Sequence, residues 1–398
     1  GTLRPLRGAL PVAAVCRREG VPTLVLPEAN AREAAAVEGV RVFGAPSLQA
    51  VLAHLNGGPG LARADPRESR RSARGGDVPD LADVRGQEHA KRALEVAAAG
   101  GHNLIFIGPP GVGKTMLARR LPGILPPLAG QEAIEATTIH SVAGTLPTGS
   151  GLLTVRPFRA PHHTVSDAGL VGGGSPPRPG EASLAHHGVL FLDELPEFRR
   201  NALEALRQPL EDGVVALVRA RWRVRYPARF VLVAAMNPCP CGYWGDGTDR
   251  CSCDPLHVMK YRARISGPLM DRIDLQIEVP SVEYEALAGL PRGPASAVVR
   301  ERVLEARERQ ERRFRDLVGV HCNGQMGPAE IRRHCRPTRE VAHLLQRALD
   351  RLGLSARTYH RVLKVARTLA DLEGLETIRP HHASEAIQYR GLDRRVGR

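Results

Sequence analysis

Short apolar runs and amphipathic segments alternate through the middle of this 398-residue chain. The clearest runs lie within residues 103–107, 188–192 and 230–236, and each is followed directly by a glycine or a polar residue. Apolar runs of this length are typical of strands that are buried on both faces, as in a parallel sheet covered by helices. The predicted fold class of the core is therefore α/β, with helices on both sides of a sheet (αβα).

The spacing of polar and apolar residues divides the chain into four parts. Residues 1–55 combine helical stretches with a short strand, which predicts a small α/β unit. Residues 56–79 are rich in Gly, Pro and Arg and lack periodic apolar positions, as is typical of a linker. We assign residues 80–293 to the α/β core and residues 294–398, a series of amphipathic stretches, to a helical domain. Because the chain begins at Gly1, within a segment that has the pattern of a strand, we expect it to be part of a longer protein.

The first apolar run leads into a phosphate-binding loop of the form G-x-x-x-x-G-K-[ST]. In such a loop the backbone N–H groups and the N-terminus of the next helix face the phosphates of a nucleotide. Lys114 would add a positive charge, and Thr115 would offer its hydroxyl to Mg²⁺. The predicted ATP-binding residues are Gly108, Pro109, Pro110, Gly111, Val112, Gly113, Lys114, Thr115 and Met116.

Polar side chains follow the other two apolar runs. Asp193 and Glu194 end the second run, and Asn237 ends the third. Because the carboxyl ends of parallel strands meet at one edge of a sheet, we expect these side chains to lie beside the phosphate loop. Asp193 and Thr115 would hold Mg²⁺, Glu194 would activate the attacking water, and Asn237 would sense the γ-phosphate. An Asp-Glu pair after a strand is also an ordinary helix start, but the phosphate loop favours the catalytic interpretation.

The chain is basic, and one predicted hairpin concentrates this charge. Lys and Arg number 56 against 42 Asp and Glu, a net charge of +14, which favours a polyanionic partner, although a GC-rich genome also enriches arginine. Between residues 214 and 226 the chain reads as a hairpin that turns near Ala220. Arg219, Arg221 and Arg223 would cluster at its tip and contact DNA; a solvated strand face is the alternative.

A second insertion, roughly residues 141–180, is rich in glycine and carries His162 and His163. Loops of this composition inside an enzyme domain usually move with its ligand state or contact a substrate. We expect the two histidines to be structural, because no cysteine lies near them in the sequence.

Four cysteines form two C-x-C pairs directly after the third apolar run. No apolar run approaches the roughly 20 residues that cross a bilayer, and no leader opens the chain, so we expect a cytoplasmic protein without membrane contact. In a reducing cytoplasm, such a set favours a tetrahedral Zn²⁺ site over disulfides. The predicted zinc ligands are Cys239, Cys241, Cys251 and Cys253.

Further segments resemble the AAA+ ATPases. Residues 81–87 are similar to the segment that packs beside the adenine in that class. The resemblance implies that Arg272 is the arginine finger inserted into a neighbouring subunit's site, with Arg264 second and a salt-bridged surface arginine as the alternative. It also implies that Arg357 or Arg361 reaches the γ-phosphate within the same chain, and the spacing leaves both open.

The segment at residues 20–30 resembles the end of a Lon-protease-like (S5-type) domain. In that domain a lysine lies on the preceding helix, at the position that Leu10 occupies here. The resemblance therefore implies a partial domain of this fold without peptidase activity.

Taken together, the chain resembles the magnesium-chelatase-like AAA+ ATPases of the ComM (YifB) type over nearly its whole length. The segments that carry the resemblance include Phe158-Arg-Ala-Pro-His-His163, Tyr226-Pro-Ala-Arg-Phe230 and Met236-Asn-Pro-Cys-Pro-Cys241. The resemblance implies a bacterial homo-hexamer with ATP between subunits and a helical lid. It also implies a helicase that promotes branch migration on single-stranded or branched DNA during natural transformation. The alternatives are a magnesium-chelatase motor subunit and a chaperone-like remodeller.

Overall fold

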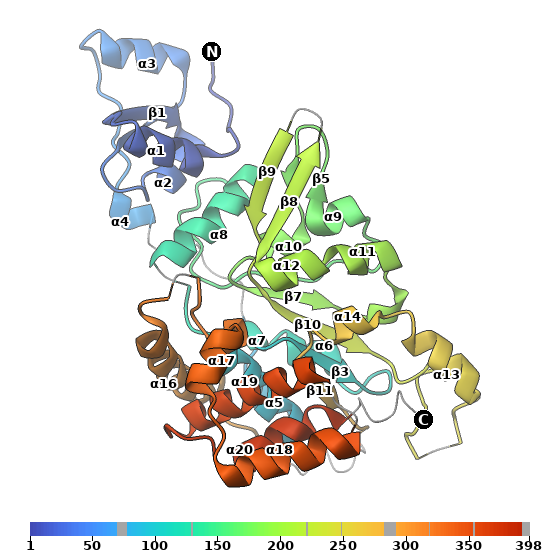
Figure 1. Cartoon of the computed structure of the whole chain (residues 1–398). Coiled ribbons are helices and arrows are strands. Elements are labelled where there is room, and N and C mark those ends of the chain that lie inside the picture. Colours follow the sequence, from blue (N-terminus) through green and yellow to red (C-terminus); the bar gives the residue numbers. More distant parts are fainter. Residues whose placement is uncertain are drawn as a thin grey trace.

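Figure 1 shows the chain, a computed structural model, as a small N-terminal unit, an α/β core and a set of C-terminal helices. The structure describes residues 1–69, 78–128, 130–219, 222–247, 249–281, 292–317, 319–352 and 355–391. It confirms the predicted α/β class, with a central parallel sheet. None of the described helices is long and apolar enough to cross a lipid bilayer.

The central sheet has five strands in the order β11-β3-β10-β7-β4, and every neighbouring pair is parallel. The strands are β3 (Leu104–Ile107), β4 (Phe158–Arg159), β7 (Val189–Leu192), β10 (Val231–Met236) and β11 (Leu275–Glu278). The apolar runs predicted β3, β7 and β10. They did not reveal β4, which is only two residues long, or β11, whose Gln276 and Glu278 interrupt the apolar pattern.

Side chains alternate between two apolar layers along the strands. Leu104 and Phe106 of β3 point into the layer that contains α5 (Glu88–Gly100) and the C-terminal helices. Ile105 and Ile107 point into the opposite layer. Because both faces are covered, each strand is a continuous apolar run. The other core helices are α6 (Lys114–Ala118), α7 (Leu121–Ile124), α8 (Gly130–Ala143), α9 (Asp167–Val171), α10 (Glu181–Leu184), α11 (Arg200–Ala205), α12 (Arg207–Asp212), α13 (Pro255–Arg262) and α14 (Gly267–Met270).

The N-terminal unit packs against α8 and is larger than the sequence predicted. Its elements are α1 (Ala9–Arg18), β1 (Thr23–Pro27), α2 (Glu28–Ala34), β2 (Arg41–Ala45), α3 (Leu48–Leu55) and α4 (Pro66–Ser69). Leu10 is fully buried in a cluster that includes Ala133 and Ala136 of α8. Part of the expected linker belongs to this unit, because the N–H of Ala64 donates to the carbonyl of Val42 in β2 at 2.9 Å. The likeness of the unit to a Lon-type domain stays a prediction.

The predicted hairpin is present and projects from the core beside the glycine-rich insertion (Figure 1). Strands β8 (Val214–Arg219) and β9 (Trp222–Pro227) are antiparallel, with Arg219 opposite Trp222, and the expected turn at Ala220 and Arg221 lies outside the described residues. The insertion forms a second small hairpin, β5 (Gly172–Gly173) with β6 (Arg178–Pro179). The Tyr226 hydroxyl donates to the carbonyl of Pro177 at 2.9 Å, which joins the two hairpins.

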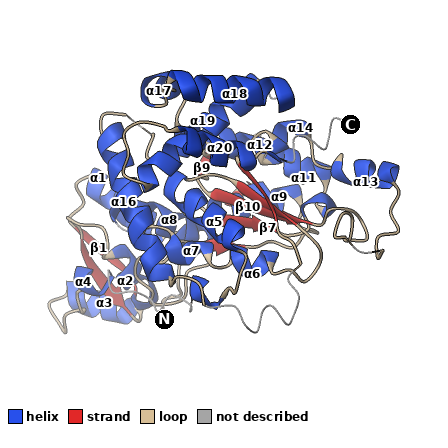
Figure 2. Ribbon diagram, turned by 90° about the horizontal axis from the view of Figure 1, so that it is seen from below, coloured by secondary structure: helices blue, strands red, loops and turns tan. Residues whose placement is uncertain are grey.

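The C-terminal helices confirm the predicted helical domain. They are α16 (Ser296–Phe314), α17 (Pro328–His334), α18 (Arg339–Leu352), α19 (Ala356–Leu372) and α20 (Pro380–Gln388). Figure 2 shows α19 and α20 between the sheet and the outer helices α17 and α18. Both α16 and α19 pack on α5, so the domain covers one face of the sheet.

A buried polar junction anchors α19 to the sheet. Asp274, at the start of β11, forms an ion pair with Arg361 of α19. His102, fully buried, lies between Asp274 Oδ2 at 3.1 Å and Thr368 Oγ1 at 2.8 Å. Burial alone would raise the pKa of Asp274, but the charge of Arg361 and the hydrogen bond from His102 hold that pKa well below its usual value.

Asp274→Asn should therefore loosen the junction. Removing the carboxylate leaves a largely buried cation unpaired, at a cost of about 3 kcal/mol in the free energy of unfolding. The matched control is Glu197→Gln, which breaks the exposed Arg264–Glu197 pair and should cost about 1 kcal/mol or less. Urea denaturation followed by circular dichroism compares the two. Equal midpoints for both variants would contradict the role of Asp274.

Candidate nucleotide-binding site

The phosphate loop joins the end of β3 to the start of α6, as the sequence predicted. Gly111 and Gly113 have φ angles of +81° and +91°, which let the loop curl back before the helix begins. Lys114 is only 8 % exposed, and its ammonium donates to the carbonyls of Gly108 at 2.6 Å and Pro109 at 2.8 Å. Burial lowers the pKa of Lys114, and the charges of Asp193 and Glu194 partly offset that effect.

The structure brings the predicted magnesium ligands together. The Thr115 hydroxyl donates to Oδ2 of Asp193 at 2.7 Å. Two adjacent oxygen ligands of an octahedral Mg²⁺ lie about 3 Å apart, since each is about 2.1 Å from the ion. The spacing and the hard oxygen donors therefore fit Mg²⁺.

Glu194 follows directly and has an unusual backbone. Its φ of +52° is rare for a residue with a side chain, and its carboxylate is 56 % exposed. His163 Nδ1 lies 3.4 Å from Oε2 of Glu194, so a histidine that the sequence suggested to be merely structural contacts the predicted base. No local pattern predicts this contact, because it joins two segments that lie 31 residues apart in the chain.

Asn237 follows β10 and completes this group. Its Oδ1 accepts a hydrogen bond from the Lys114 ammonium at 3.0 Å. The register of the sheet explains the approach, because Met236 lies opposite Ile107 in the neighbouring strand. The phosphate loop, the two acidic residues and the amide therefore share the carboxyl edge of the sheet, as predicted.

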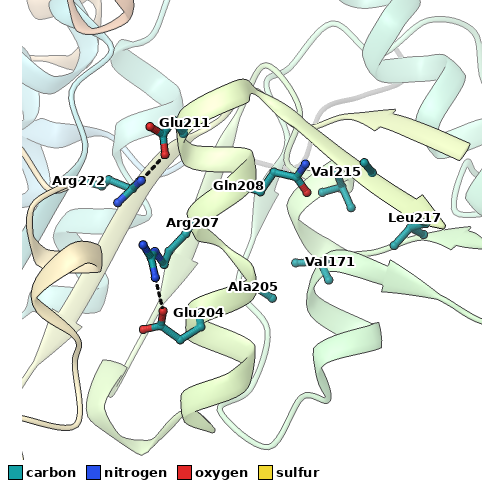
Figure 3. Close-up of a pocket in the computed structure, with 10 residues that line it drawn as sticks. Val171, Glu204, Ala205, Arg207, Gln208, Glu211, Val215, Leu217 and Arg272 are labelled. Carbon is teal, nitrogen blue, oxygen red and sulfur yellow. Dashed lines mark hydrogen bonds and ion pairs between the residues drawn. The ribbon is translucent and has the colours of Figure 1, made fainter.

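Arg272 lies at the other edge of the sheet. Its carbonyl accepts from Asn103, which precedes β3, at 2.9 Å. Its guanidinium forms an ion pair with Glu211 of α12, at the wall of a pocket of about 550 Å³ (Figure 3). The hydrogen bond and charge of Arg272 lower the pKa of Glu211, and Arg357 and Arg207 contribute further through their charges. Arg264, the second candidate, pairs with Glu197 at 2.9 Å.

The two candidate sensor arginines lie toward this second edge. Arg361 is held by Asp274 at the amino end of β11, and Arg357 is one turn of α19 before it, near Glu211. A contact of either arginine with the γ-phosphate of the same chain stays a prediction.

The predicted DNA-binding arginines are only partly described. Arg221 lies outside the described residues, and of Arg219 only the backbone is described. Arg223 is exposed on β9, beside Trp222, which is 47 % exposed. Val218, opposite Arg223, is 69 % exposed, so this end of the hairpin presents both apolar and cationic side chains to solvent.

The four predicted zinc ligands converge. Cys239 Sγ lies 3.3 Å from Cys241 Sγ and 3.8 Å from Cys251 Sγ, and the Sγ atoms of the whole set, which includes Cys253, lie within 4.8 Å of one another. A tetrahedral zinc with Zn–S bonds of about 2.3 Å places its sulfurs about 3.8 Å apart. A disulfide needs about 2.05 Å, so the arrangement fits a metal. The N–H of Tyr243 and the neighbouring thiols lower the pKa of Cys241 to about 6.

Two other groups combine one glutamate with two histidines, but they fit a metal poorly. In one, His186 Nδ1 accepts the N–H of Arg229 at 3.0 Å. In the other, His382 Nδ1 accepts the N–H of Arg379 at 2.9 Å. A neutral imidazole that accepts at Nδ1 carries its proton on Nε2, the atom that faces the glutamate. His186 Nε2 hydrogen-bonds to Glu135 at 3.3 Å, and His382 Nε2 lies 3.0 Å from Glu373, so in both groups a protonated nitrogen instead of a lone pair faces the carboxylate.

Comparisons with known proteins agree with this geometry. The family described as magnesium chelatase, subunit ChlI, matches residues 80–287, and the C-terminal part of that family matches residues 293–390. The chain is 46 % identical to competence protein ComM of Haemophilus influenzae over 397 residues, which are 99 % of this chain and 76 % of ComM. It is 45 % identical to YifB of Escherichia coli over 395 residues, again 99 % and 76 % of the two chains.

A more distant relative matches a shorter part of the chain. The 38 kDa subunit of magnesium chelatase from Rhodobacter capsulatus is 28 % identical over 197 residues, 45 % of this chain and 55 % of that subunit. The chain thus matches the ComM and YifB proteins over almost all of its length and the chelatase subunit over less than half. It belongs to the magnesium chelatase ChlI family of AAA+ type and, within that family, to the group of ComM and YifB proteins.

Proposed function

We propose that the protein is an ATP hydrolase that works as a DNA motor in a ring of identical subunits. The observation that carries the hydrolase proposal is the convergence of Lys114, Asn237 and the Thr115–Asp193 pair at one sheet edge. Lys114 and the loop N–H groups bind the phosphates, and Thr115 and Asp193 hold Mg²⁺, which neutralises phosphate charge when bound. Glu194 orients and deprotonates the attacking water.

Glu194→Gln tests this assignment. The amide keeps the shape of the side chain but cannot accept a proton, so ATP should still bind while its hydrolysis falls by at least about 100-fold. Nucleotide binding is measured by fluorescence of a labelled ATP analogue, and turnover by phosphate release. Turnover near the wild-type rate in this variant would refute the role of Glu194.

We further propose that a neighbouring subunit completes each site. Arg272 and Arg357 gather around Glu211 at the edge opposite to their own phosphate loop. A nucleotide bound to the next subunit of a ring would offer a stronger anion than Glu211 does, and it would draw Arg272 out of its ion pair. This arrangement supports a homo-oligomer, and a hexamer follows by analogy with AAA+ proteins.

Arg272→Ala should lower turnover without weakening nucleotide binding by the same chain. Loss of a finger arginine commonly costs 10³-fold or more in rate, so a drop of about 1,000-fold is expected. Arg264→Ala is made in parallel because Arg264 is the competing candidate. If only the Arg264 variant loses activity, the assignment moves to Arg264.

DNA is proposed as the substrate on the strength of the projecting hairpin. The hairpin presents Arg223, Trp222 and Val218 to solvent, which suits a phosphate backbone and a stacked base. The net charge of +14 favours a polyanion. A relative of 46 % identity is named competence protein ComM. We therefore infer helicase or branch-migration activity on single-stranded or branched DNA.

DNA should stimulate hydrolysis through the hairpin. In the variant with Arg221→Ala and Arg223→Ala, stimulation should be lost and basal turnover kept. The matched control, Arg312→Ala in α16 with Arg315→Ala just after that helix, removes the same charge from two other exposed positions. Stimulation should also weaken with added salt, since phosphate contacts release counterions. If the rate of ATP hydrolysis in an assembled ring is the same with and without DNA, a chelatase-type or remodelling partner is favoured instead.

Finally, we propose that Cys239, Cys241, Cys251 and Cys253 bind a structural Zn²⁺. The close approach of their sulfurs supports it. Four thiolates close the coordination sphere and leave no position for a substrate, so this zinc would order the chain and not react.

A further inference from the structure

The cysteine loop, which comprises described residues 238–247 and 249–253, lies directly against the phosphate loop. Gly242 in the cysteine loop has a φ of +94°. A Cβ atom built on it would lie 2.6 Å from Cδ and 2.8 Å from Cγ of Pro110. Only a glycine allows this approach, which seats the backbone of Gly242 on the ring of Pro110 in the middle of the phosphate loop.

The same glycine is tied to the metal ligands. Its N–H lies 3.2 Å from Sγ of Cys239 and donates to that sulfur and to the Cys239 carbonyl. Cys239 in turn follows Asn237 by two residues, and Asn237 accepts from Lys114 at 3.0 Å. Cys239 is therefore connected to the phosphate loop on two sides, through Gly242 to Pro110 and through Asn237 to Lys114.

Besides the cysteines, a polar group helps to order this loop, because Arg250 pairs with Asp246 at 2.9 Å and lies 4.4 Å from the centroid of the Tyr243 ring, but the loop buries little apolar surface. Among its described residues only Pro238, Cys239 and Gly242 are buried, and Trp244 is 37 % exposed. A loop with so small an apolar core does not offset the entropy of ordering its backbone. Coordination by four sulfurs supplies that order, as it does in small metal-dependent folds.

We propose that zinc in the cysteine loop acts as a brace for the nucleotide site: metal occupancy holds Pro110 and Asn237 in place and so sets the affinity for nucleotide. The proposal rests on the proposed zinc site and adds to it an effect of the metal on nucleotide binding. With the metal bound, the Gly242 backbone supports the phosphate loop, and Asn237 keeps the Lys114 ammonium directed into it. Without the metal, both supports relax and nucleotide affinity falls.

Two glycine substitutions separate this support from general strain in the loop. Gly242→Ala and Gly245→Ala both place a side chain at positive φ, +94° and +77°, but a Cβ on Gly245 meets no atom within 4 Å. Zinc content is measured by atomic emission on protein purified without chelator, and affinity by titration with a fluorescent ADP. We expect one zinc per chain throughout and about tenfold weaker ADP binding in Gly242→Ala alone.

A metal-removal experiment completes the test. Wild-type protein is stripped with a chelator and exchanged into buffer with Mg²⁺, and ADP affinity should fall by about tenfold or more and return when Zn²⁺ is added. Wild-type protein that contains no zinc overturns the zinc site itself. Zinc that is present, with ADP affinity unchanged by Gly242→Ala and by stripping, overturns only the brace. If the Gly242→Ala variant loses its zinc, its ADP affinity reflects loss of the metal as well as of the contact with Pro110. The stripped wild-type protein then provides the test of the brace.

Discussion

The parallel register of β3, β10 and β7 is the constraint on which the nucleotide site depends. Met236 lies opposite Ile107, and Ala234 lies opposite Leu192, so these strands end at a common edge. The phosphate loop, Asp193 and Asn237 each come within one residue of those ends. A shift of one residue in any strand would turn its side chains to the wrong layer, so burial of both faces fixes the register. The geometry of the site follows from core packing.

Arg272 and Arg361 make their contacts at the opposite, amino edge of the same sheet. The helical domain packs on the α5 face and is held there by Asp274, His102 and Arg361 at the amino edge. This junction holds α19 on the same face as α5. The phosphate loop with its polar residues therefore lies at one edge of the sheet and Arg272 with Arg361 at the other, which is the arrangement on which the proposed ring rests.

The hairpin and the glycine-rich insertion lie beside the two edges of the sheet. The hairpin β8–β9 leaves α12, the helix that carries Glu211, and packs through Tyr226 on the glycine-rich insertion. The insertion also delivers His163 to Glu194. If Arg272 moved away from Glu211, the change would occur next to the base of the hairpin, because α12 directly precedes β8. The cysteine loop, in contrast, contacts the phosphate loop directly.

The sequence by itself determined the α/β core, the helical domain, the phosphate loop, the polar residues that follow β7 and β10, the two strands of the hairpin and the four converging cysteines. Each of these is a local pattern, since burial on both faces yields apolar runs and a tight loop requires glycines at fixed spacing. Only the tertiary structure decided where the helical domain packs, and with it the placement of Arg357 and Arg361. It also revealed the contacts of His163 with Glu194 and of Gly242 with Pro110. These depend on distances between segments far apart in the chain, and no periodicity within a single segment encodes them.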